Sequence, residues 1–304
     1  MKLAHVALDV PLEEAFDFLI PEGQLAPVGS LVVVPFGRTR RVGVVVGLAE
    51  GSRVPVERLK SIESVVADIP PIASAELELY DFCARYYQRP LGEVLGTVLP
   101  PRLRQVSRRQ LVAPGEAGGA APRLVEAQPL TQEQREAIAS CATGSDAFQA
   151  VLLHGVTGSG KTEVYLHLIA RALAAGRQAL FLVPEIGLTP QFETQVRQRF
   201  PDANLVAAHS HLGEGERAAT WLAAQSGAAH IVLGTRLAVL MPFRRLGLIV
   251  VDEEHDLSYK QQEGLRYSAR DIAVRRAQRL GIPVILGSAT PSLETYANAR
   301  DGRY

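Results

Sequence analysis

The residues best suited to chemistry in this chain form one short run, residues 155–162. The run follows apolar residues 151–153 and precedes a helical pattern, which is the strand, loop and helix context of a phosphate-binding loop. In such a loop, glycines free the backbone N–H groups to bind phosphate at a helix N-terminus, together with a lysine. A strand-to-helix turn without a ligand is the alternative. The predicted nucleotide-binding residues are Gly155, Thr157, Gly158, Ser159, Gly160, Lys161, Thr162 and Glu163. Thr162 would also hold Mg²⁺.

A second candidate site follows the apolar run at residues 248–251, which predicts a buried parallel strand. The run is followed by Asp252, Glu253, Glu254 and His255. Asp252 is expected to hold the Mg²⁺ water shell, Glu253 to orient and deprotonate an attacking water, and His255 to face the γ-phosphate. Together with Lys161 these three are the candidate catalytic residues. The alternative is an acidic cluster that caps the next helix at its positive end.

The composition limits the class of protein. The chain has 304 residues, 47% hydrophobic and 21% charged, which suits about two domains with their own cores. No apolar stretch is long enough for a membrane span, and the first residues do not form a signal peptide, so we expect a cytoplasmic protein with no membrane partner. The formal net charge of zero argues against indiscriminate binding of polyanions. Cys83 and Cys141 lie far apart, which predicts two buried thiols rather than a disulfide or a zinc site.

The hydrophobic pattern predicts two domains, residues 1–105 and 129–304, with a linker over residues 106–128. The first domain begins with short β-rich runs typical of a small barrel and continues with a helix over residues 72–88. The second alternates apolar runs with helical patterns, which predicts an α/β fold with a doubly wound parallel sheet. The apolar runs are residues 151–154, 179–183, 205–208, 230–233, 247–252 and 283–287.

A basic stretch precedes the linker. No acidic residue lies between Glu93 and Glu116, and the arginines of this stretch are Arg102, Arg104, Arg108 and Arg109. A nucleic-acid contact and a solvated linker both account for this pattern.

Longer motifs resemble a known family. Residues 252–255, together with Ser288-Ala289-Thr290, look like motifs II and III of superfamily 2 helicases. The segments 4–8, 183–191, 234–236 and 256–271 are similar to those of the PriA family of bacterial primosomal helicases, which restart replication. The resemblance implies that residues 129–304 form a RecA-like helicase lobe that binds ATP and Mg²⁺. It also implies that the full-length parent unwinds DNA from 3′ to 5′ and initiates primosome assembly.

The resemblance further implies that the first domain holds the 3′ end of a nascent leading strand at a stalled fork. Its pocket would be Phe16, Asp17, Gly37 and Lys60. Phe16 can stack on the terminal base, Asp17 can accept a hydrogen bond from a free 3′-hydroxyl, and Lys60 can pair with a phosphate. Without the resemblance, Phe16 would be interpreted as a core aromatic and Gly37 as a turn glycine.

Gln134 has two interpretations. The family suggests that this glutamine reads the edge of adenine. Thr131 followed three residues later by Gln134 is also a capping box, which would only satisfy the first donors of its own helix. Specificity for adenine therefore rests on the resemblance.

Further DNA contacts follow from the same resemblance. Arg236, next to Thr235, and the loop of residues 184–189 would contact the backbone of single-stranded DNA. A second DNA-facing segment would stack on bases and report DNA occupancy to Glu253. Its members are Tyr259, Lys260, Arg266 and Tyr267. The alternative is that the two tyrosines only pack this loop.

Three hydroxyls have expected roles. Ser268 is expected to cap the following helix. Ser288 and Thr290 would couple the nucleotide side of the lobe to its DNA side through hydrogen bonds.

Two features depart from the family pattern. The family carries a winged-helix domain before the helicase lobe, and the stretch between Gln105 and Leu130 is too short for one. The sequence also ends at Tyr304, before the second motor lobe, its arginine finger and the zinc module of the family, so zinc is not expected here. Because an arginine finger contributes about 10³ to 10⁵ in rate, we expect binding of nucleotide and DNA with weak hydrolysis.

The expected ligands are forked and single-stranded DNA and 3′ DNA ends. Single-stranded DNA-binding protein and other primosome proteins are expected partners by resemblance. The alternative is a non-motor module that binds DNA ends under the control of a nucleotide switch. A P-loop enzyme acting on small molecules is disfavoured by the DNA-facing segments.

Overall fold

The computed structural model describes residues 2–106, 114–115, 120–141 and 147–304. Arg108 and Arg109 of the basic stretch lie outside the described residues. The chain divides into two compact units. The first consists of Met1–Pro114, Gly213–Ser226 and Glu263–Leu265, and the second of Gly115–Leu212, Gly227–Gln262 and Arg266–Tyr304.

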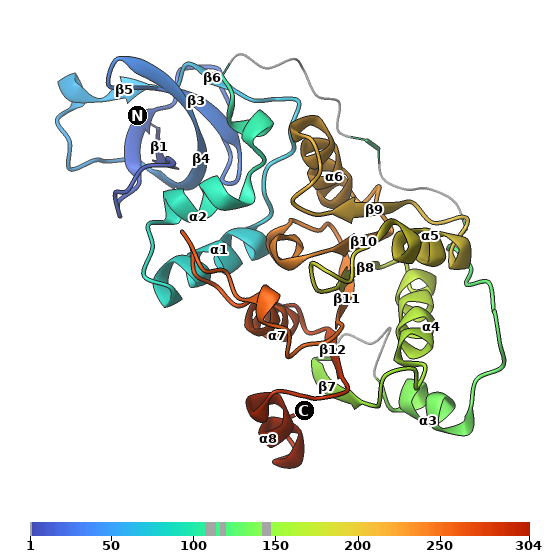
Figure 1. The fold of residues 1–304 in the computed structure, drawn as a ribbon. Coiled ribbons are helices and arrows are strands. Elements are labelled where there is room, and N and C mark those ends of the chain that lie inside the picture. The colour runs from blue at the N-terminus through green and yellow to red at the C-terminus, as the bar shows by residue number, and fades with distance from the viewer. Residues whose placement is uncertain (1, 107–113, 116–119, 142–146) are drawn as a thin grey trace. The chain divides into compact units, whose positions relative to one another are not determined.

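The first unit contains a curled six-stranded sheet that forms a half-barrel (Figure 1). Its strands are β1 (Leu3–Ala7), β2 (Phe16–Leu19), β3 (Leu31–Phe36), β4 (Thr39–Ala49), β5 (Lys60–Ser61) and β6 (Ser64–Val65), in the order β5-β2-β1-β4-β3-β6. Alternate residues of the strands, such as Val32 and Val34, are buried in a common core with Phe18, as expected for strands with one face turned inward. The barrel-like domain predicted from the short β-rich runs is confirmed.

Helices complete the first unit. They are α1 (Ser74–Tyr86), α2 (Leu91–Val98) and α6 (Glu214–Ser226), with short 3₁₀ turns at Val56–Arg58 and Pro101–Arg104. The helix predicted over residues 72–88 corresponds to α1. Cys83 is buried on α1, and Cys141 is buried in the second unit; both are free thiols, as predicted.

The second unit is built on a parallel six-stranded sheet (Figure 1). Its strands are β7 (Gln149–His154), β8 (Gln178–Leu182), β9 (Leu205–Ala208), β10 (Ile231–Gly234), β11 (Leu246–Val251) and β12 (Pro283–Ser288), in the order β7-β12-β11-β8-β10-β9. Every neighbouring pair is parallel. Each strand matches one of the predicted apolar runs, because a parallel sheet covered on both faces buries nearly every side chain of its central strands.

Helices of the second unit cover this sheet. Helices α3 (Gln132–Ser140), α4 (Lys161–Ala174) and α5 (Pro190–Arg199) supply Ile138, Leu168 and Val196 to a core shared with the sheet. Helix α7 (Ala269–Leu280) follows a loop after β11, and α8 (Leu293–Arg300) follows β12. Short 3₁₀ turns lie at Arg236–Leu240 and Leu257–Tyr259. The predicted α/β fold is confirmed, and its strands β7, β11 and β12 end beside one another.

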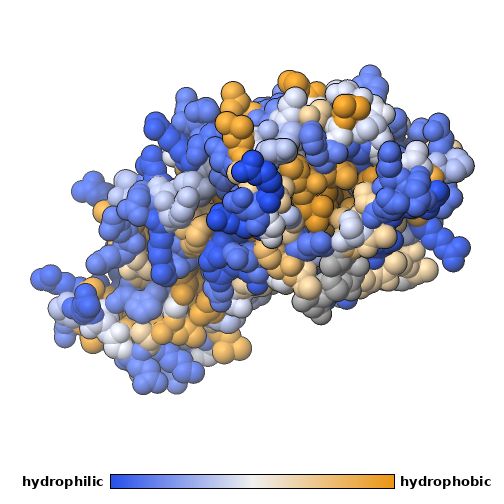
Figure 2. All heavy atoms as spheres, turned by 90° about the horizontal axis from the view of Figure 1, so that it is seen from below, coloured by the Kyte–Doolittle hydropathy of each residue, from blue (hydrophilic) through white to orange (hydrophobic). Residues whose placement is uncertain are grey.

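The described residues give three further observations. Hydrophilic residues cover most of the face in Figure 2, and apolar residues gather there in separate patches. In the part of the chain that the structure describes, no helix is long and apolar enough to cross a membrane. Over the same residues, no three His, Cys, Asp or Glu side chains are grouped to hold a metal ion.

Candidate nucleotide site and DNA-facing residues

The glycine-rich loop connects β7 to α4 and has the backbone geometry of a phosphate cradle. Gly158 and Gly160 have φ angles of +80° and +82°. Residues with a Cβ atom rarely adopt this backbone conformation. Gly160 is the N-cap of α4, so the first N–H groups of the helix face into the loop. The Lys161 ammonium donates to the carbonyl of Gly155 at 2.9 Å and lies within 3.4 Å of the Val156 carbonyl. Lysine and loop are therefore preorganised around one concavity, with Thr162 next along the first turn of α4.

Asp252 lies directly after β11, and two tyrosines hold it in place. The Tyr165 hydroxyl donates to Asp252 Oδ1 at 3.0 Å, and the Tyr259 hydroxyl donates to the Asp252 carbonyl at 2.7 Å. Burial raises the pKa of the Asp252 carboxyl, and the hydrogen bond from Tyr165 opposes that effect. A Cβ at Gly287 would lie 1.5 Å from the Tyr165 oxygen. The tyrosine can therefore reach Asp252 only because residue 287 is glycine.

Glu253 faces the phosphate-binding loop. Its Oε1 lies 3.7 Å from Lys161 Nζ, its Oε2 lies 3.7 Å from His255 Nδ1, and 32% of its side chain is exposed. Its φ angle is +44°, an unusual conformation for a residue with a side chain, which costs about 1–3 kcal/mol and often marks a functional site. The unusual backbone and the contact with Lys161 thus occur at the same residue.

Glu254 has a different environment from its neighbour, because its side chain is fully buried. Its Oε1 accepts from the Ser292 N–H at 2.7 Å. Its Oε2 accepts from the hydroxyls of Ser292 and Thr295 and from the Arg270 guanidinium, at 3.1, 2.9 and 3.2 Å. The carboxylate thus ties the segment after β11 to the starts of α7 and α8, and it does so away from the phosphate-binding loop.

His255, Ser288 and Thr290 form one hydrogen-bonded group. Ser288 Oγ accepts from the Thr290 N–H at 3.0 Å and lies 2.8 Å from His255 Nδ1. His255 Nε2 lies 3.3 Å from Thr290 Oγ1. Ser288 Oγ has one proton and two acceptor positions, so it can accept from the Thr290 N–H and share a second hydrogen bond with Nδ1. The group joins the segments that follow β11 and β12.

Gln134 has the capping geometry described by its second interpretation. Its Oε1 accepts from the Thr131 N–H at 2.9 Å, and the Thr131 hydroxyl accepts from the Gln134 N–H at 3.2 Å. Its Nε2 also lies 3.4 Å from the Gly160 carbonyl. A Cβ at position 160 would lie 2.2 Å from this nitrogen, so Gly160 also permits the approach of Gln134 to the loop. Contact with adenine stays a prediction.

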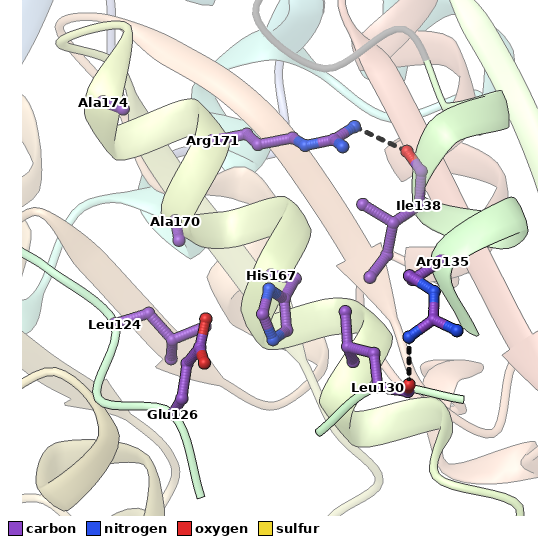
Figure 3. A pocket seen from close by; sticks show the side chains of 9 residues that line it. All are labelled: Leu124, Glu126, Leu130, Arg135, Ile138, His167, Ala170, Arg171 and Ala174. Atoms are coloured by element: carbon purple, nitrogen blue, oxygen red, sulfur yellow. Dashed lines mark hydrogen bonds between the residues drawn. The ribbon is translucent and has the colours of Figure 1, made fainter. Parts of the chain in front are cut away.

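A cavity of about 470 Å³ lies between α3, α4 and the segment that leads into α3 (Figure 3). It is lined by Leu124, Glu126, Leu130, Arg135, Ile138, His167, Ala170, Arg171 and Ala174. Arg135 and Arg171 donate to the carbonyls of Leu130 and Ile138 at 2.5 and 2.6 Å. His167 follows Lys161 by six residues, which is about 9 Å along a helix. The part of the cavity that α4 lines therefore begins about 9 Å from Lys161 along the helix axis.

An ion pair contacts the segment that carries the lining residues Leu124 and Glu126. Arg199 donates to both carboxylate oxygens of Glu163 at 2.6 Å, and its Nε donates to the Val125 carbonyl at 2.5 Å. The hydrogen bond from Arg199 holds the pKa of the Glu163 carboxyl below its usual value. Glu163, predicted as a nucleotide residue, thus joins α4 to α5 and to the segment before α3.

The predicted DNA-facing residues after Asp252 separate into two groups. Lys260 and Arg266 are exposed, whereas only 2% of Tyr259 and 1% of Tyr267 are exposed. Burial raises the pKa of the Tyr259 hydroxyl well above its ordinary value. Both rings pack within the loop, as in the alternative above, and base stacking stays a prediction.

Arg236 supports the same loop. Its Nη1 donates to the carbonyls of Ser258 and Lys260 at 2.8 and 3.3 Å. Ser268 caps α7 by accepting from the Asp271 N–H at 3.3 Å, as predicted.

In the first unit, Phe16 and Asp17 begin β2. Phe16 packs edge-on against Phe36, with the ring centroids 5.1 Å apart, and Phe36 immediately precedes Gly37, whose φ angle is +59°. Lys60 is exposed on β5, opposite Phe18 of β2. The contact of Phe16 with Phe36 brings β2 close to the turn at Gly37, and a common pocket of these four residues stays a prediction.

Asp17 has two neighbours that our sequence reasoning missed. Its Oδ1 lies 2.6 Å from His5 Nδ1, and its Oδ2 accepts from the Ser52 hydroxyl. The antiparallel register places His5 opposite Asp17, a pairing that the sequence signals only through the alternation of β1 and β2.

Arginines near the turn at Gly37 were also missed. The Arg41 guanidinium lies 5.7 Å from the centre of the Phe36 ring, and Arg38 and Arg40 are exposed beside Gly37. Three arginines within residues 38–41 were a visible signal. By contrast, Arg104 of the basic stretch is paired with Asp9 at 2.6 Å.

Comparisons with known proteins agree with both units. The 3′DNA-binding domain (3′BD) family of PriA matches residues 5–100, and the DEAD/DEAH box helicase family matches residues 131–299. The replication restart protein PriA of Haemophilus influenzae is 35% identical over 100% of this chain and 51% of its own length. The chain belongs to the PriA family of DEAD/DEAH box helicases. The 3′DNA-binding domain family matches residues of the first unit, whereas the helicase family matches residues 131–299, which include α6 of the first unit.

Other PriA proteins show how this chain is related to the family. PriA of Rickettsia conorii is 35% identical over 100% of the chain and 45% of its own length, and PriA of Bacillus subtilis is 47% identical over 59% of the chain and 22% of its own length. The chain spans about half the length of the curated PriA relatives that it matches along its whole length. The alignment with the Haemophilus protein covers 374 positions, more than the 304 residues of this chain, whereas that with Rickettsia conorii covers 304. The Haemophilus protein therefore carries additional residues inside the aligned range.

Proposed function

We propose that this chain binds ATP with Mg²⁺ in its helicase lobe and a DNA 3′ end in its first unit, and that the full-length parent is a 3′ to 5′ helicase of replication restart. The observation that carries the nucleotide part is the meeting of Lys161 and Glu253 at 3.7 Å across the mouth of the phosphate-binding loop. Lys161 at the start of α4 and Glu253 after β11 would meet beside the terminal phosphate. This arrangement supports hydrolysis rather than binding alone.

The residues of the cradle divide the chemistry between them. The N–H groups at the start of α4 and the Lys161 ammonium would bind the β- and γ-phosphates. Thr162 and Asp252 are oxygen ligands of the kind that Mg²⁺ accepts, partly through water. The ion would neutralise charge on the phosphate oxygens when bound. Asp252 fits this role because the Tyr165 hydroxyl orients its carboxylate.

Glu253 is the proposed general base. Its partly exposed carboxylate would take a proton from an attacking water, with Lys161 and His255 on either side. Hydrolysis by this chain alone is expected to be weak, since the arginine finger of the family belongs to a second motor lobe.

The nucleoside is proposed to lie between Gln134 and the end of the cavity near Leu130 and His167. Gln134→Ala should reduce the preference for ATP over GTP, and Thr131→Ala, which removes the cap but keeps the amide, should not. Ala170→Trp would narrow the cavity and should weaken binding of ATP more than binding of inorganic triphosphate. If Gln134→Ala and Thr131→Ala show the same preference for ATP over GTP, the adenine contact is refuted.

DNA is proposed to bind both units. In the first, Phe16 would stack on the terminal base, Asp17 would accept from the 3′-hydroxyl, and Lys60 would contact a phosphate. Arg38 and Arg41 are additional candidates for phosphate contacts.

In the lobe, Arg236, Lys260 and Arg266 are proposed to contact the strand backbone. The link from Tyr259 to Asp252 and the group formed by His255, Ser288 and Thr290 would transmit DNA occupancy to the nucleotide. Single-stranded DNA-binding protein and primosome proteins are proposed partners of the full-length parent.

The experiment that tests this function uses a labelled single strand ending in a 3′-hydroxyl or a 3′-phosphate. Wild type should prefer the hydroxyl, and Asp17→Ala should lose the preference. A second titration with and without a non-hydrolysable ATP analogue measures the coupling, with Lys161→Ala as the control. Equal binding of both ends would contradict end recognition, and end recognition that ignores nucleotide would favour a non-motor module.

A further inference from the structure

Asp17 belongs to a hydrogen-bonded cluster that begins with the pairing of β1 and β2. The register places His5 directly opposite Asp17, so both side chains lie on one face of the sheet. The pairing of β1 with β4 shifts between His5 and Val6, and such bulges re-aim side chains. Gly47 lies opposite His5, and a Cβ there would come within 3.0 Å of the imidazole. The fold therefore makes room for the imidazole beside Asp17.

Both carboxylate oxygens of Asp17 are held by donors. His5 Nδ1 lies 2.6 Å from Oδ1, and the Ser52 hydroxyl donates to Oδ2. Ser52 Oγ accepts from the Val54 N–H at 2.9 Å, which directs the hydroxyl proton toward Asp17. Only 15% of the Asp17 side chain is exposed, against 38% for His5. The carboxylate plane is thus fixed from both sides while one edge reaches solvent.

The order of the three groups decides what they can do. The Ser52 hydroxyl donates to the carboxylate rather than to the imidazole, so the histidine cannot activate it as a nucleophile, as a catalytic triad requires. An ionised carboxylate has about four acceptor positions, and His5 and Ser52 use two of them. The remaining positions suit a donor that arrives from solvent, such as a sugar hydroxyl.

We propose that His5 and Ser52 are positioning residues that hold Asp17 in the orientation that selects a free 3′-hydroxyl. The proposal rests on the proposed 3′-end function and adds two specificity-determining residues to it. An acceptor held within narrow limits of angle loses little freedom when a ligand binds, which is the advantage of a preorganised site. An Asp17 with one donor removed would rotate and bind the hydroxyl less well.

The test compares two fluorescent strands of the same sequence, one ending in a 3′-hydroxyl and one in a 3′-hydrogen. Ser52→Ala and His5→Leu each remove a donor and keep most of the bulk. Each should weaken binding of the hydroxyl strand about five- to tenfold, within the net contribution of one ordinary hydrogen bond, and leave binding of the hydrogen strand unchanged. His5→Asn keeps an N–H donor at the same δ position and should restore much of the preference. Ser74→Ala, an exposed serine on α1, is the matched control.

The outcomes distinguish failure of 3′-end recognition from failure of the positioning role of His5 and Ser52. If wild type binds both strands alike, the 3′-end function fails and this inference fails with it. If wild type prefers the hydroxyl and both donor variants keep that preference, end recognition stands and the positioning role is overturned. Equal weakening of both strands would mean that the cluster only supports the fold, which also overturns the proposal. In an Asp17→Ala background, the donor substitutions should change nothing further.

Discussion

The same substitution at two adjacent glutamates should impair two different properties, hydrolysis in one case and stability in the other. Glu253→Gln should remove the proposed ATP hydrolysis and leave the free energy of unfolding nearly unchanged. Glu254→Gln should destabilise the helicase lobe instead. The reason is the contrast in environment: Glu253 has 32% of its side chain exposed, whereas the Glu254 side chain is fully buried and accepts four hydrogen bonds.

The expected size follows from the donors around Glu254. The N–H of Ser292 can only donate, and so can the guanidinium of Arg270, whereas the hydroxyls of Ser292 and Thr295 can turn to accept. A glutamine can offer its oxygen to one of the two fixed donors, and its NH₂ group must then face the other. Hydrogen bonds to charged groups contribute about 1.5–3 kcal/mol, so we expect a loss of about 2–3 kcal/mol. For a domain of this size, 1 kcal/mol shifts Tm by about 2–4 °C.

Urea unfolding followed by far-UV circular dichroism measures both variants. The free energy of unfolding of Glu253→Gln should lie within about 0.5 kcal/mol of the wild-type value, which is the usual range for surface substitutions. Hydrogen exchange at the start of α8 should accelerate in Glu254→Gln and stay unchanged in Glu253→Gln. Equal stabilities of the two variants would refute the assigned contrast, and so would a larger loss for Glu253→Gln.

Three further predictions concern the nucleotide lobe. Asp252→Asn should raise the Tm of the protein without nucleotide. Burial raises the pKa of the Asp252 carboxyl, so keeping it ionised at neutral pH costs free energy that an amide avoids. Calorimetry at neutral pH measures the change in Tm, and a lower Tm would contradict the prediction. The ion pair of Glu163 with Arg199 lowers the pKa of the Glu163 carboxyl in the folded protein. The ion pair therefore contributes fully to the free energy of unfolding above the ordinary pKa of about 4.3. This contribution is lost as the pH falls through the lower folded-state pKa. Acid unfolding of Arg199→Met should accordingly have a shallower slope below about pH 4.3 than wild type, and an unchanged slope would refute the link. Gly287→Ala should destabilise the lobe by about 1–3 kcal/mol, because the new Cβ would lie 1.5 Å from the Tyr165 oxygen. Adding Tyr165→Phe should restore part of the lost stability. If the losses of the two single variants simply add in the double variant, the clash is refuted.

Local sequence patterns determined much of the architecture. Apolar runs such as residues 247–252 indicated β11, because a strand covered on both faces needs almost only apolar residues. The glycines at 158 and 160 and the lysine at 161 indicated the phosphate-binding loop, because its backbone geometry depends on residue types adjacent in the chain. Both features are local, so the sequence alone could predict them.

Tertiary structure decided what each carboxylate does. Nothing in the order Asp252-Glu253-Glu254 says which carboxylate faces the cradle and which is buried, since that depends on a positive φ at Glu253 and on donors about forty residues away along the chain. The partners of Asp17 likewise come from another strand and a distant turn. Side chains that meet through strand pairing and helix packing leave no local signal, and for that reason the hydrogen-bonded clusters of this protein became visible only in the folded chain.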